Sequence, residues 1–366
     1  MENLEQILNE FEITNVTQIV PFGAGLINRT YKVETKGQGS FLLQKLNSVA
    51  LPNIDKVLQN IEAVGNYLKS INENCLFLRK TKNGQNSIKD AEGFVYRVYP
   101  FIKNSVSYDF SRDENIIFQV AYGFGRFDRL VRGIEDGKVV VSDEHFHDTL
   151  YKYEHFKNAV KIDRCGRVSE IQNEILEADN IIRYAKQKGI DIFQISKLKD
   201  SRKLKTQVVH NDTKLNNCLL DENNKYLCVV DLDTCMPGLV INDFADGIRY
   251  IANLATEDEE NLDKVGVNFA SYKAFTSGFF KGLNYEIDEL ERQLLSISPI
   301  AIAFELGCRF LEDYINGDVF FKVDLLRPNL NLIRARVQFR YCKALIDNLP
   351  KEKEIIEKVF SDKGNC

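Results

Sequence analysis

The sequence lacks several features that would place the chain in a particular class of protein. No run approaches the ~20 consecutive apolar residues of a membrane-spanning helix. There is no CxxC pair and no HExxH spacing, and most of the eight cysteines lie inside apolar runs, which indicates buried, reduced thiols rather than a disulfide framework or a zinc site. No tract interleaves basic with aromatic residues, and the net charge is only −5, which argues against a nucleic-acid partner. We expect a cytoplasmic protein with no nucleic-acid or membrane partner and no evident obligatory protein partner.

The hydrophobic pattern changes its period along the 366 residues. Residues 15–46 and 75–102 alternate β-branched and aromatic runs with turn residues, which predicts strands. Residues 53–71 have helical spacing, and helical patterns dominate from Asp113 onward. This organisation predicts an α+β fold with two lobes: a small β-rich N-lobe and a larger, mostly helical C-lobe. Ligand sites prefer the cleft between such lobes.

Acidic and amide side chains are concentrated in the stretch VVHNDTKLNNCLLDENNKYLCVVDLDT, residues 208–234. Asp212, Asn217, Asp231 and Asp233 lie at the ends of two apolar, strand-like runs and are expected to face one point in space. Carboxylates that lie this close repel each other unless a cation lies among them, and Mg²⁺ prefers oxygen ligands. The alternative is an ordinary turn in which Asp212 and Asn217 bind local backbone.

The pattern H-x-D-x-x-x-x-N, followed fourteen residues after the Asn by an Asp that ends an apolar strand, matches the template for phosphoryl transfer. VVHNDTKLNN and CVVDLDT resemble the catalytic and metal motifs of the aminoglycoside phosphotransferase and choline kinase superfamily. VVDLDTCMPGLVINDFADGIRY and FELGCRFLEDYINGDVFFK resemble the N-acetylhexosamine kinases that phosphorylate the anomeric hydroxyl. The resemblance covers about residues 16–341.

This resemblance implies a protein-kinase-like fold that uses ATP and Mg²⁺. It implies that the nucleotide-binding N-lobe is residues 1–102 and that the catalytic, sugar-binding C-lobe is residues 103–366. It makes Asp212 the catalytic carboxylate and Asn217 and Asp231 the metal ligands, with Asp233 as a substrate contact or a residue behind the metal.

The nucleotide is expected to lie against the N-lobe. Gly23 and Gly25, in PFGAGLINRTYKV, would let backbone amides approach phosphate oxygens, although for this short GxG by itself a plain β-turn is the better interpretation. The backbone around Tyr99, Pro100 and Ile102 is the expected hinge that binds adenine.

A lysine follows two apolar residues on the strand SFLLQKL, where Phe41, Leu43 and Lys45 share one face. A buried ammonium needs a partner, and Glu62 on the following helix is the candidate. Such a pair would bring Lys45 to the α- and β-phosphates, as in protein-kinase-like folds. The alternatives are a lysine at the strand edge and a solvent-facing glutamate.

The acceptor pocket should be rich in hydrogen-bonding groups, since sugars carry many hydroxyls. The candidates are Asn28, His147, Asp246, Arg309 and Asp313. Arg309 and Asp313 are four residues apart on one helix, so an intrahelical salt bridge is an equally good interpretation. For His147 a loop position without a role is the alternative. Leu26 stands where the resembling kinases often have His, which bears on substrate preference.

The predicted function is transfer of phosphate from ATP to the anomeric hydroxyl of GlcNAc or GalNAc, which yields the sugar 1-phosphate and ADP. The alternatives are a kinase of another small hydroxylated metabolite, such as choline, homoserine or an aminoglycoside, and a metal-dependent phosphohydrolase. A catalytically inactive nucleotide-binding scaffold is disfavoured by the complete set of Asp212, Asn217 and Asp231.

Overall fold

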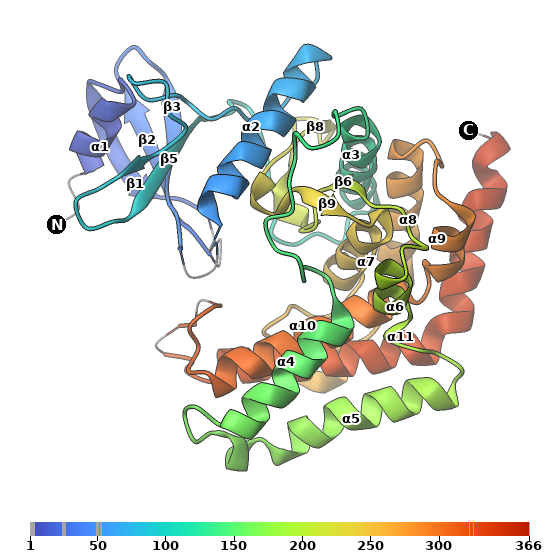
Figure 1. The fold of residues 1–366 in the computed structure, drawn as a ribbon. Helices are drawn as coiled ribbons and strands as arrows, with labels where there is room; N and C mark the ends of the chain where they lie inside the picture. Colours follow the sequence, from blue (N-terminus) through green and yellow to red (C-terminus); the bar gives the residue numbers. More distant parts are fainter. Residues whose placement is uncertain are drawn as a thin grey trace.

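The computed structural model describes residues 4–23, 27–48, 51, 53–321, 323–324 and 326–365. It has a small lobe built on a five-stranded antiparallel sheet with the strand order β1-β2-β3-β5-β4 (Figure 1). Its strands are β1 (Val16–Pro21), β2 (Arg29–Thr35), β3 (Ser40–Lys45), β4 (Ile88–Lys89) and β5 (Val95–Pro100), and its helices are α1 (Leu4–Glu10) and α2 (Ile54–Ser70). The predicted β-rich small lobe is therefore confirmed.

The two faces of the small sheet have different neighbours, because alternate residues of a strand point to opposite sides. On one face, Phe41 and Leu43 of β3 are buried in a cluster with Phe11, next to α1. On the other face, Leu42 packs against the main core, and Gln44 lines a cavity shared with the large lobe. The second face is therefore the one that looks into the space between the lobes.

The large lobe is mostly helical, as predicted, and contains two short two-stranded sheets in which β6 pairs with β9 and β7 pairs with β8. Its strands are β6 (Gln207–Val209), β7 (Cys218–Leu220), β8 (Tyr226–Val229) and β9 (Met236–Gly238). Its helices are α3 (Glu114–Val131), α4 (Thr149–Ile162), α5 (Gln172–Gln187), α6 (Gln194–Asp200), α7 (Val240–Ile251), α8 (Phe269–Gly282), α9 (Glu289–Leu294), α10 (Ser298–Ile315) and α11 (Leu330–Ser361).

Helices α3 and α8 pack closely because small residues lie where they meet. A side-chain carbon at Gly125 would lie 1.9 Å from the carbonyl oxygen of Phe279, and one at Gly278 would lie 2.2 Å from the carbonyl oxygen of Phe118. Glycine is therefore required at both positions for this approach. Helix α3 of this pair also contacts the strands β6, β7 and β8.

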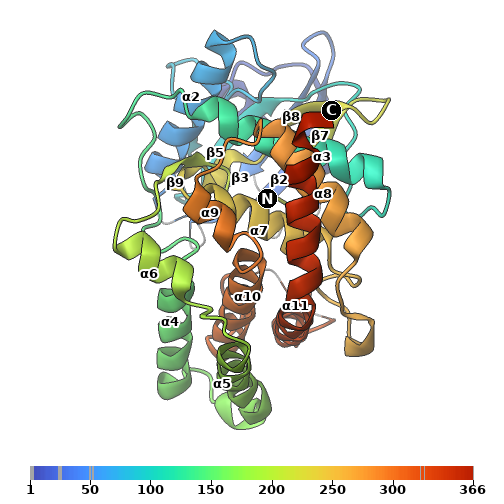
Figure 2. The ribbon, with the colours of Figure 1, turned by 90° about the vertical axis from the view of Figure 1, so that its right-hand side faces the viewer.

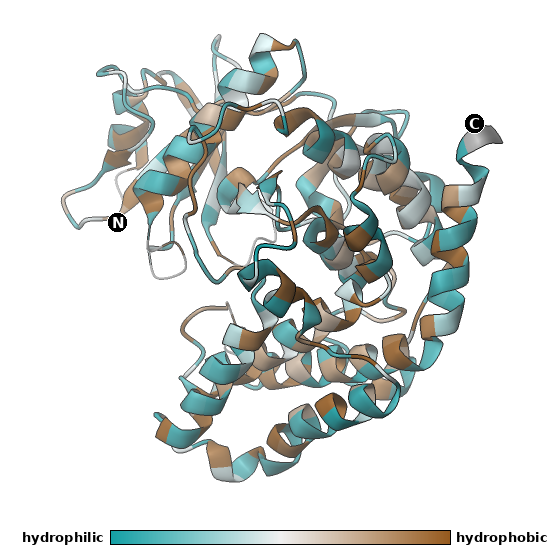
Figure 3. Ribbon diagram, turned by 45° about the vertical axis from the view of Figure 1, so that its right-hand side comes forward, coloured by the Kyte–Doolittle hydropathy of each residue, from teal (hydrophilic) through white to brown (hydrophobic). Residues whose placement is uncertain are grey.

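Helices α4, α5, α10 and α11 form a second helical layer of the large lobe. Helix α10 lies between α4 and α11, and α11 also contacts α5 (Figure 2). Teal and brown segments alternate along these helices, as expected for amphipathic helices that bury one side (Figure 3). Among the described helices, none combines the length and the apolarity needed to cross a membrane.

Candidate active site

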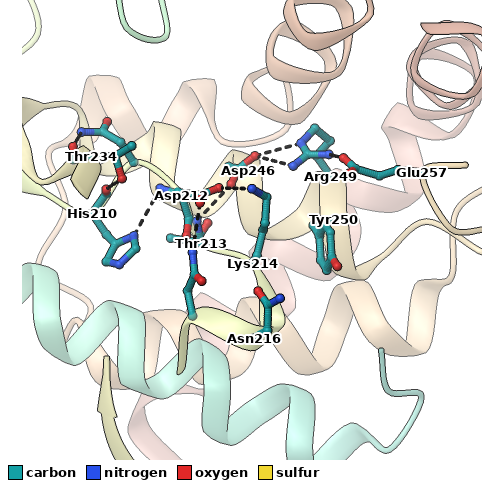
Figure 4. Close-up of polar contacts among 12 residues, drawn as sticks. His210, Asp212, Thr213, Lys214, Asn216, Thr234, Asp246, Arg249, Tyr250 and Glu257 are labelled. Carbon is teal, nitrogen blue, oxygen red and sulfur yellow. Dashed lines mark hydrogen bonds and ion pairs between the residues drawn. The ribbon is translucent and has the colours of Figure 1, made fainter. Parts of the chain in front are cut away.

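The segment between β6 and β7 carries the acidic motif and is held by two carboxylates of helix α7. Asp243 accepts hydrogen bonds from the backbone amides of His210 and Asn211, both at 2.7 Å, and Asp246 accepts one from the amide of Thr213 at 3.0 Å. Both carboxylates are buried. The neighbouring Asp212 is therefore presented on a loop whose backbone is fixed (Figure 4).

His210 is packed into the core beneath this loop. Its ring meets Phe124 and Phe127 edge-on, with centroids 5.2 and 5.7 Å away, and its Nε2 lies 2.9 Å from the carbonyl oxygen of Val230. The side chain is fully buried. This environment suits a histidine that orients the loop rather than one that reacts.

Two side chains contact the Asp212 carboxylate from the same loop. The Nζ atom of Lys214 lies 2.8 Å from Oδ1 (Figure 4). Nδ2 of Asn217 donates a hydrogen bond to Oδ2 at 3.0 Å. Burial opposes the charge on Lys214, but Asp212, with Glu257 and Asp246, raises its pKa. Lys214 therefore remains a cation beside the carboxylate. Lys214 was not predicted from the sequence, although its place two residues after Asp212 in the motif was the available signal.

Asp231 follows β8 in a left-handed backbone conformation, with φ at 60°. Asp231 is an exposed residue in the wall of a cavity between the lobes. Loss of hydration and the charges of Asp233 and Asp212 raise the pKa of Asp231 to about 7. A cation bound among these carboxylates would relieve that repulsion.

The donor set fits a magnesium ion that shares its coordination with phosphates. Among the described residues, no three His, Cys, Asp or Glu side chains converge on one metal position. Asn217 uses its amide nitrogen to bind the backbone oxygen of Asp212 at 2.9 Å as well as the Asp212 carboxylate, so its own oxygen is left for a ligand. Mg²⁺ is commonly held by one or two protein oxygens, with substrate phosphates completing the shell.

Asp233 joins the two lobes. Its Oδ1 lies 2.5 Å from Nη1 of Arg97 on β5, and its Oδ2 accepts a hydrogen bond from Nδ2 of Asn28 at 2.8 Å. The Nε atom of Arg97 donates to Gln44 at 2.9 Å, which fixes the guanidinium on the inner face of the sheet. Both oxygens of the predicted substrate contact are therefore engaged by the small lobe. Arg97 was also overlooked, although an arginine in the apolar strand VYRVYP signals a buried partner.

The predicted pairing of Lys45 with Glu62 is wrong. Glu62 binds Lys80 and accepts a hydrogen bond from Asn86 at 2.7 Å, while Nζ of Lys45 lies 3.3 Å from the ring centroid of Phe94. Lys45 shares the face of β3 that packs toward α1, so the residue directed at the large lobe is Gln44. The sequence-based prediction thus assigned Lys45 to the inner face of the sheet, whereas the neighbouring residue Gln44 occupies that face.

The roles of the other predicted nucleotide residues remain predictions. Gly23 has φ of 77°, and Gly25 and Leu26 lie outside the described residues. Tyr99 is buried and its ring lies 5.2 Å from the Arg97 guanidinium. Pro100 ends β5, and Ile102 packs against the main core.

Most of the predicted acidic and acceptor residues line one cavity of about 560 Å³ between the lobes. The predicted residues in its wall are Asn28, His147, Asp212, Asn217, Asp231, Asp233, Asp246 and Arg309. Asp313 is not among them. Its carboxylate accepts hydrogen bonds from the backbone amides of residues 319–321, so it shapes the turn after α10.

Helix α10 does not contain the intrahelical salt bridges that its spacing allowed. Glu305 accepts a hydrogen bond from Thr149 at 3.1 Å and lies 3.4 Å from Nδ1 of His147. The Arg309 guanidinium lies 5.4 to 5.9 Å from three phenyl rings, those of Phe146, Phe320 and Phe321. His147 and Arg309 are therefore held at the cavity wall by different parts of the large lobe.

Comparison with known proteins identifies the family. The sequence model of the phosphotransferase enzyme family (APH) matches residues 18–275, more than half of the chain. The chain belongs to this phosphotransferase family. As a member, it is an enzyme that transfers a phosphoryl group to a hydroxyl on a small acceptor.

Solved structures of several kinases and phosphotransferases are similar in fold to this phosphotransferase. A microcompartment-associated aminopropanol kinase matches with a TM-score of 0.60 and 13% identity over 96% of this chain and 98% of that one. An aminoglycoside phosphotransferase from Alicyclobacillus acidocaldarius matches with 0.58 and 13% over 96% of each chain. An amicoumacin kinase in complex with AMP-PNP, Ca²⁺ and Ami matches with a TM-score of 0.57 and 14% identity over 92% of this chain and 93% of that one. At these identities the likeness establishes the two-lobed, kinase-like fold alone.

Proposed function

We propose that this phosphotransferase is an ATP-dependent kinase that phosphorylates the anomeric hydroxyl of an N-acetylhexosamine, GlcNAc or GalNAc, to give the sugar 1-phosphate and ADP. The observation that carries the proposal is the convergence of Asp212, Asn217 and Asp231 on one cavity between the lobes. The buried thiols agree with the cytoplasmic location that we also propose.

Asp212 is the proposed catalytic carboxylate. Lys214 and Asn217 each contact one of its oxygens, so the carboxylate has a defined orientation toward the cavity. An acceptor hydroxyl that donates a hydrogen bond to Asp212 is held with its oxygen toward the phosphoryl group. Because phosphoryl transfer requires little covalent work from the protein, such positioning supplies much of the rate.

Asn217 and Asp231 are the proposed ligands of Mg²⁺. When bound, the ion would offset the negative charge of the β- and γ-phosphates. Asp231 provides an anionic oxygen at the cavity wall, and Asn217 provides a neutral one beside Asp212. Lys214 adds a fixed positive charge in the same region, which also favours a phosphate there.

The nucleotide is proposed to bind under the inner face of the small sheet. Gln44 and Thr30 project from this face into the cavity. The backbone of residues 99–102, the proposed adenine-binding hinge, includes the end of β5 and the residues that follow it. The acceptor is proposed to lie toward His147, Asp246 and Arg309. The proposal that it is an N-acetylhexosamine is supported by the resemblance of FELGCRFLEDYINGDVFFK, because Arg309 and Phe320 from this stretch line the cavity.

An ADP-release assay over free hexosamines tests the proposal, with phosphorus NMR to locate the phosphate on the product. We expect turnover of GlcNAc or GalNAc and a phosphate on the anomeric oxygen, and roughly 1,000-fold slower turnover for Asp212→Asn with nucleotide binding retained. Choline, homoserine and an aminoglycoside serve as comparison acceptors. Preferential use of one of them, or phosphate release without any acceptor, would contradict the proposal.

A further inference from the structure

A second cavity of about 390 Å³ adjoins the first. It lies among the N-terminal end of α2, the loop before α4, helices α4 and α10, and the turn after α10. The two cavities share part of their walls, including Phe146, Asp233, Arg309, Phe320 and Phe321. Asp212 lines only the first cavity. A ligand whose reacting hydroxyl lies at Asp212 would therefore occupy the first cavity. Only a substituent that extends past Arg309 would enter the second cavity.

Two cationic side chains with unused donors face this second cavity. Arg309 stacks among three phenyl rings, and no hydrogen bond or ion pair joins its guanidinium to another residue in the described part of the chain. Lys152 of α4 has a side chain only 17% exposed, and its nearest carboxylate oxygen, on Asp143, is 3.8 Å away. Burial and the charge of Arg309 lower the pKa of Lys152, so the two cations repel each other.

The carboxylates in the same wall each have another partner, and of these only Asp143, through Oδ2, lies within ion-pair distance of Lys152. Asp143 accepts a hydrogen bond from the backbone amide of His145 at 2.9 Å, and Glu312 lies 3.6 Å from Nδ1 of His155. Asp313 binds the backbone of the turn after α10, and Asp233 binds Arg97 and Asn28. Within the described residues, Lys152 therefore has only the 3.8 Å contact with Asp143 and the Arg309 guanidinium donates no hydrogen bond, so a ligand anion would supply both with close acceptors.

We propose that the second cavity is a subsite for a negatively charged substituent of the acceptor, a carboxylate that is bound by Lys152 and Arg309 while the reacting hydroxyl lies at Asp212. This inference rests on the proposed function and narrows its substrate class to acidic N-acetylated sugars. Tyr151, stacked on His145 with centroids 3.5 Å apart, gives the wall beside Lys152 a rigid shape.

Matched acceptors that differ only in charge test the subsite. One pair is N-acetylglucosaminuronic acid and its uronamide, and another is the 3-O-carboxymethyl and 3-O-carbamoylmethyl ethers of GlcNAc. We expect the carboxylate of at least one pair to have a kcat/KM about tenfold higher than its amide, the effect of a charge-assisted hydrogen bond. Lys152→Gln should reduce this ratio toward one, and Lys152→Arg should restore it. Far-UV circular dichroism confirms that each variant is folded.

Lys161→Gln is the control, because Lys161 is an exposed lysine of the same helix and lines neither cavity. It removes the same charge and should leave the ratio unchanged.

Ratios near one for both pairs, or a preference that survives Lys152→Gln, would overturn the subsite. If neutral GlcNAc or GalNAc is phosphorylated without any charge preference, only this inference fails. If no N-acetylated sugar releases ADP, the proposed function fails with it. Free acetate should not replace the attached carboxylate, and stimulation of GlcNAc turnover by acetate would overturn the assignment to the acceptor.

Discussion

Replacing Asp233 with alanine should strongly destabilise the protein, because it leaves the guanidinium of Arg97 buried without its partner. The Arg97 side chain is 1% exposed and that of Asp233 is 9% exposed, and their charged atoms are 2.5 Å apart. At that distance and an effective dielectric constant of about 20, the Coulomb attraction is about 7 kcal/mol. The free energy needed to remove both charges from water offsets most of this attraction. Removing only one partner, however, typically lowers the free energy of unfolding by about 3–5 kcal/mol.

A double-mutant cycle separates this mechanism from a simple loss of packing. Arg97→Met combined with Asp233→Ala removes both charges, so we expect the double variant to be about 2 kcal/mol more stable than Asp233→Ala alone. Glu286→Ala breaks an ion pair with Arg132 in which the Glu286 side chain is 50% exposed, and this control should cost less than about 1 kcal/mol.

The measurement is urea-induced unfolding, monitored by circular dichroism and tyrosine fluorescence, since the chain has fifteen tyrosines and no tryptophan. The free energies of unfolding of the wild type, both singles and the double give the coupling energy. A loss below about 1 kcal/mol for Asp233→Ala, or a double variant no more stable than Asp233→Ala, would refute the buried interlobe pair.

Three further perturbations have defined outcomes. Asp231→Ala should weaken the binding of Mg-ATP at least about tenfold in isothermal titration calorimetry, and unchanged affinity would contradict its role as a metal ligand. Burial disfavours protonated His147, but Glu305 and Asp246 raise its pKa above 6.5, so its contribution to stability is full below pH 6.5 and is lost as pH rises through the raised value. His147→Gln should remove this pH dependence of the unfolding free energy, and an unaltered profile would contradict it. Glu352 is fully buried, neither of its carboxylate oxygens has a hydrogen-bond partner among the described residues, and burial raises its pKa to about 9. The unfolding free energy of Glu352→Gln should therefore exceed that of the wild type by an amount that grows between pH 4.5 and about 9. No such difference at the alkaline end would contradict the prediction.

The parts of the fold that sequence predicted are those encoded by local patterns. The change from strand-like to helical periodicity predicted the two lobes, and the structure confirms them. The spacing of Asp212, Asn217 and Asp231 indicated a common site, because short strands and one loop separate them. The assignment of roles to these three residues stays a prediction.

The parts that sequence did not predict depend on contacts between distant segments. Asn28 and Asp233 are 205 positions apart, and no local pattern indicates that they bind each other. The error at Lys45 has a different origin. Both faces of β3 are covered, one by α1 and one by the large lobe, so an apolar run did not reveal which face looks into the cavity. A shift of one residue was enough to exchange Gln44 with Lys45.

One short turn carries both the proposed metal ligand and the contact between the lobes. Asp231 and Asp233 lie two residues apart, and Asp231 has a left-handed conformation that costs free energy for any residue other than glycine. Such a conformation persists only where its surroundings hold it, and here Arg97 and Asn28 of the small lobe bind Asp233, two residues after Asp231. The orientation of Asp231 is thus linked to the position of the small lobe. The proposed nucleotide site lies under that lobe. The contacts of Asp233 with Arg97 and Asn28 would therefore fix both the position of the small lobe and the orientation of the Asp231 carboxylate toward the phosphates.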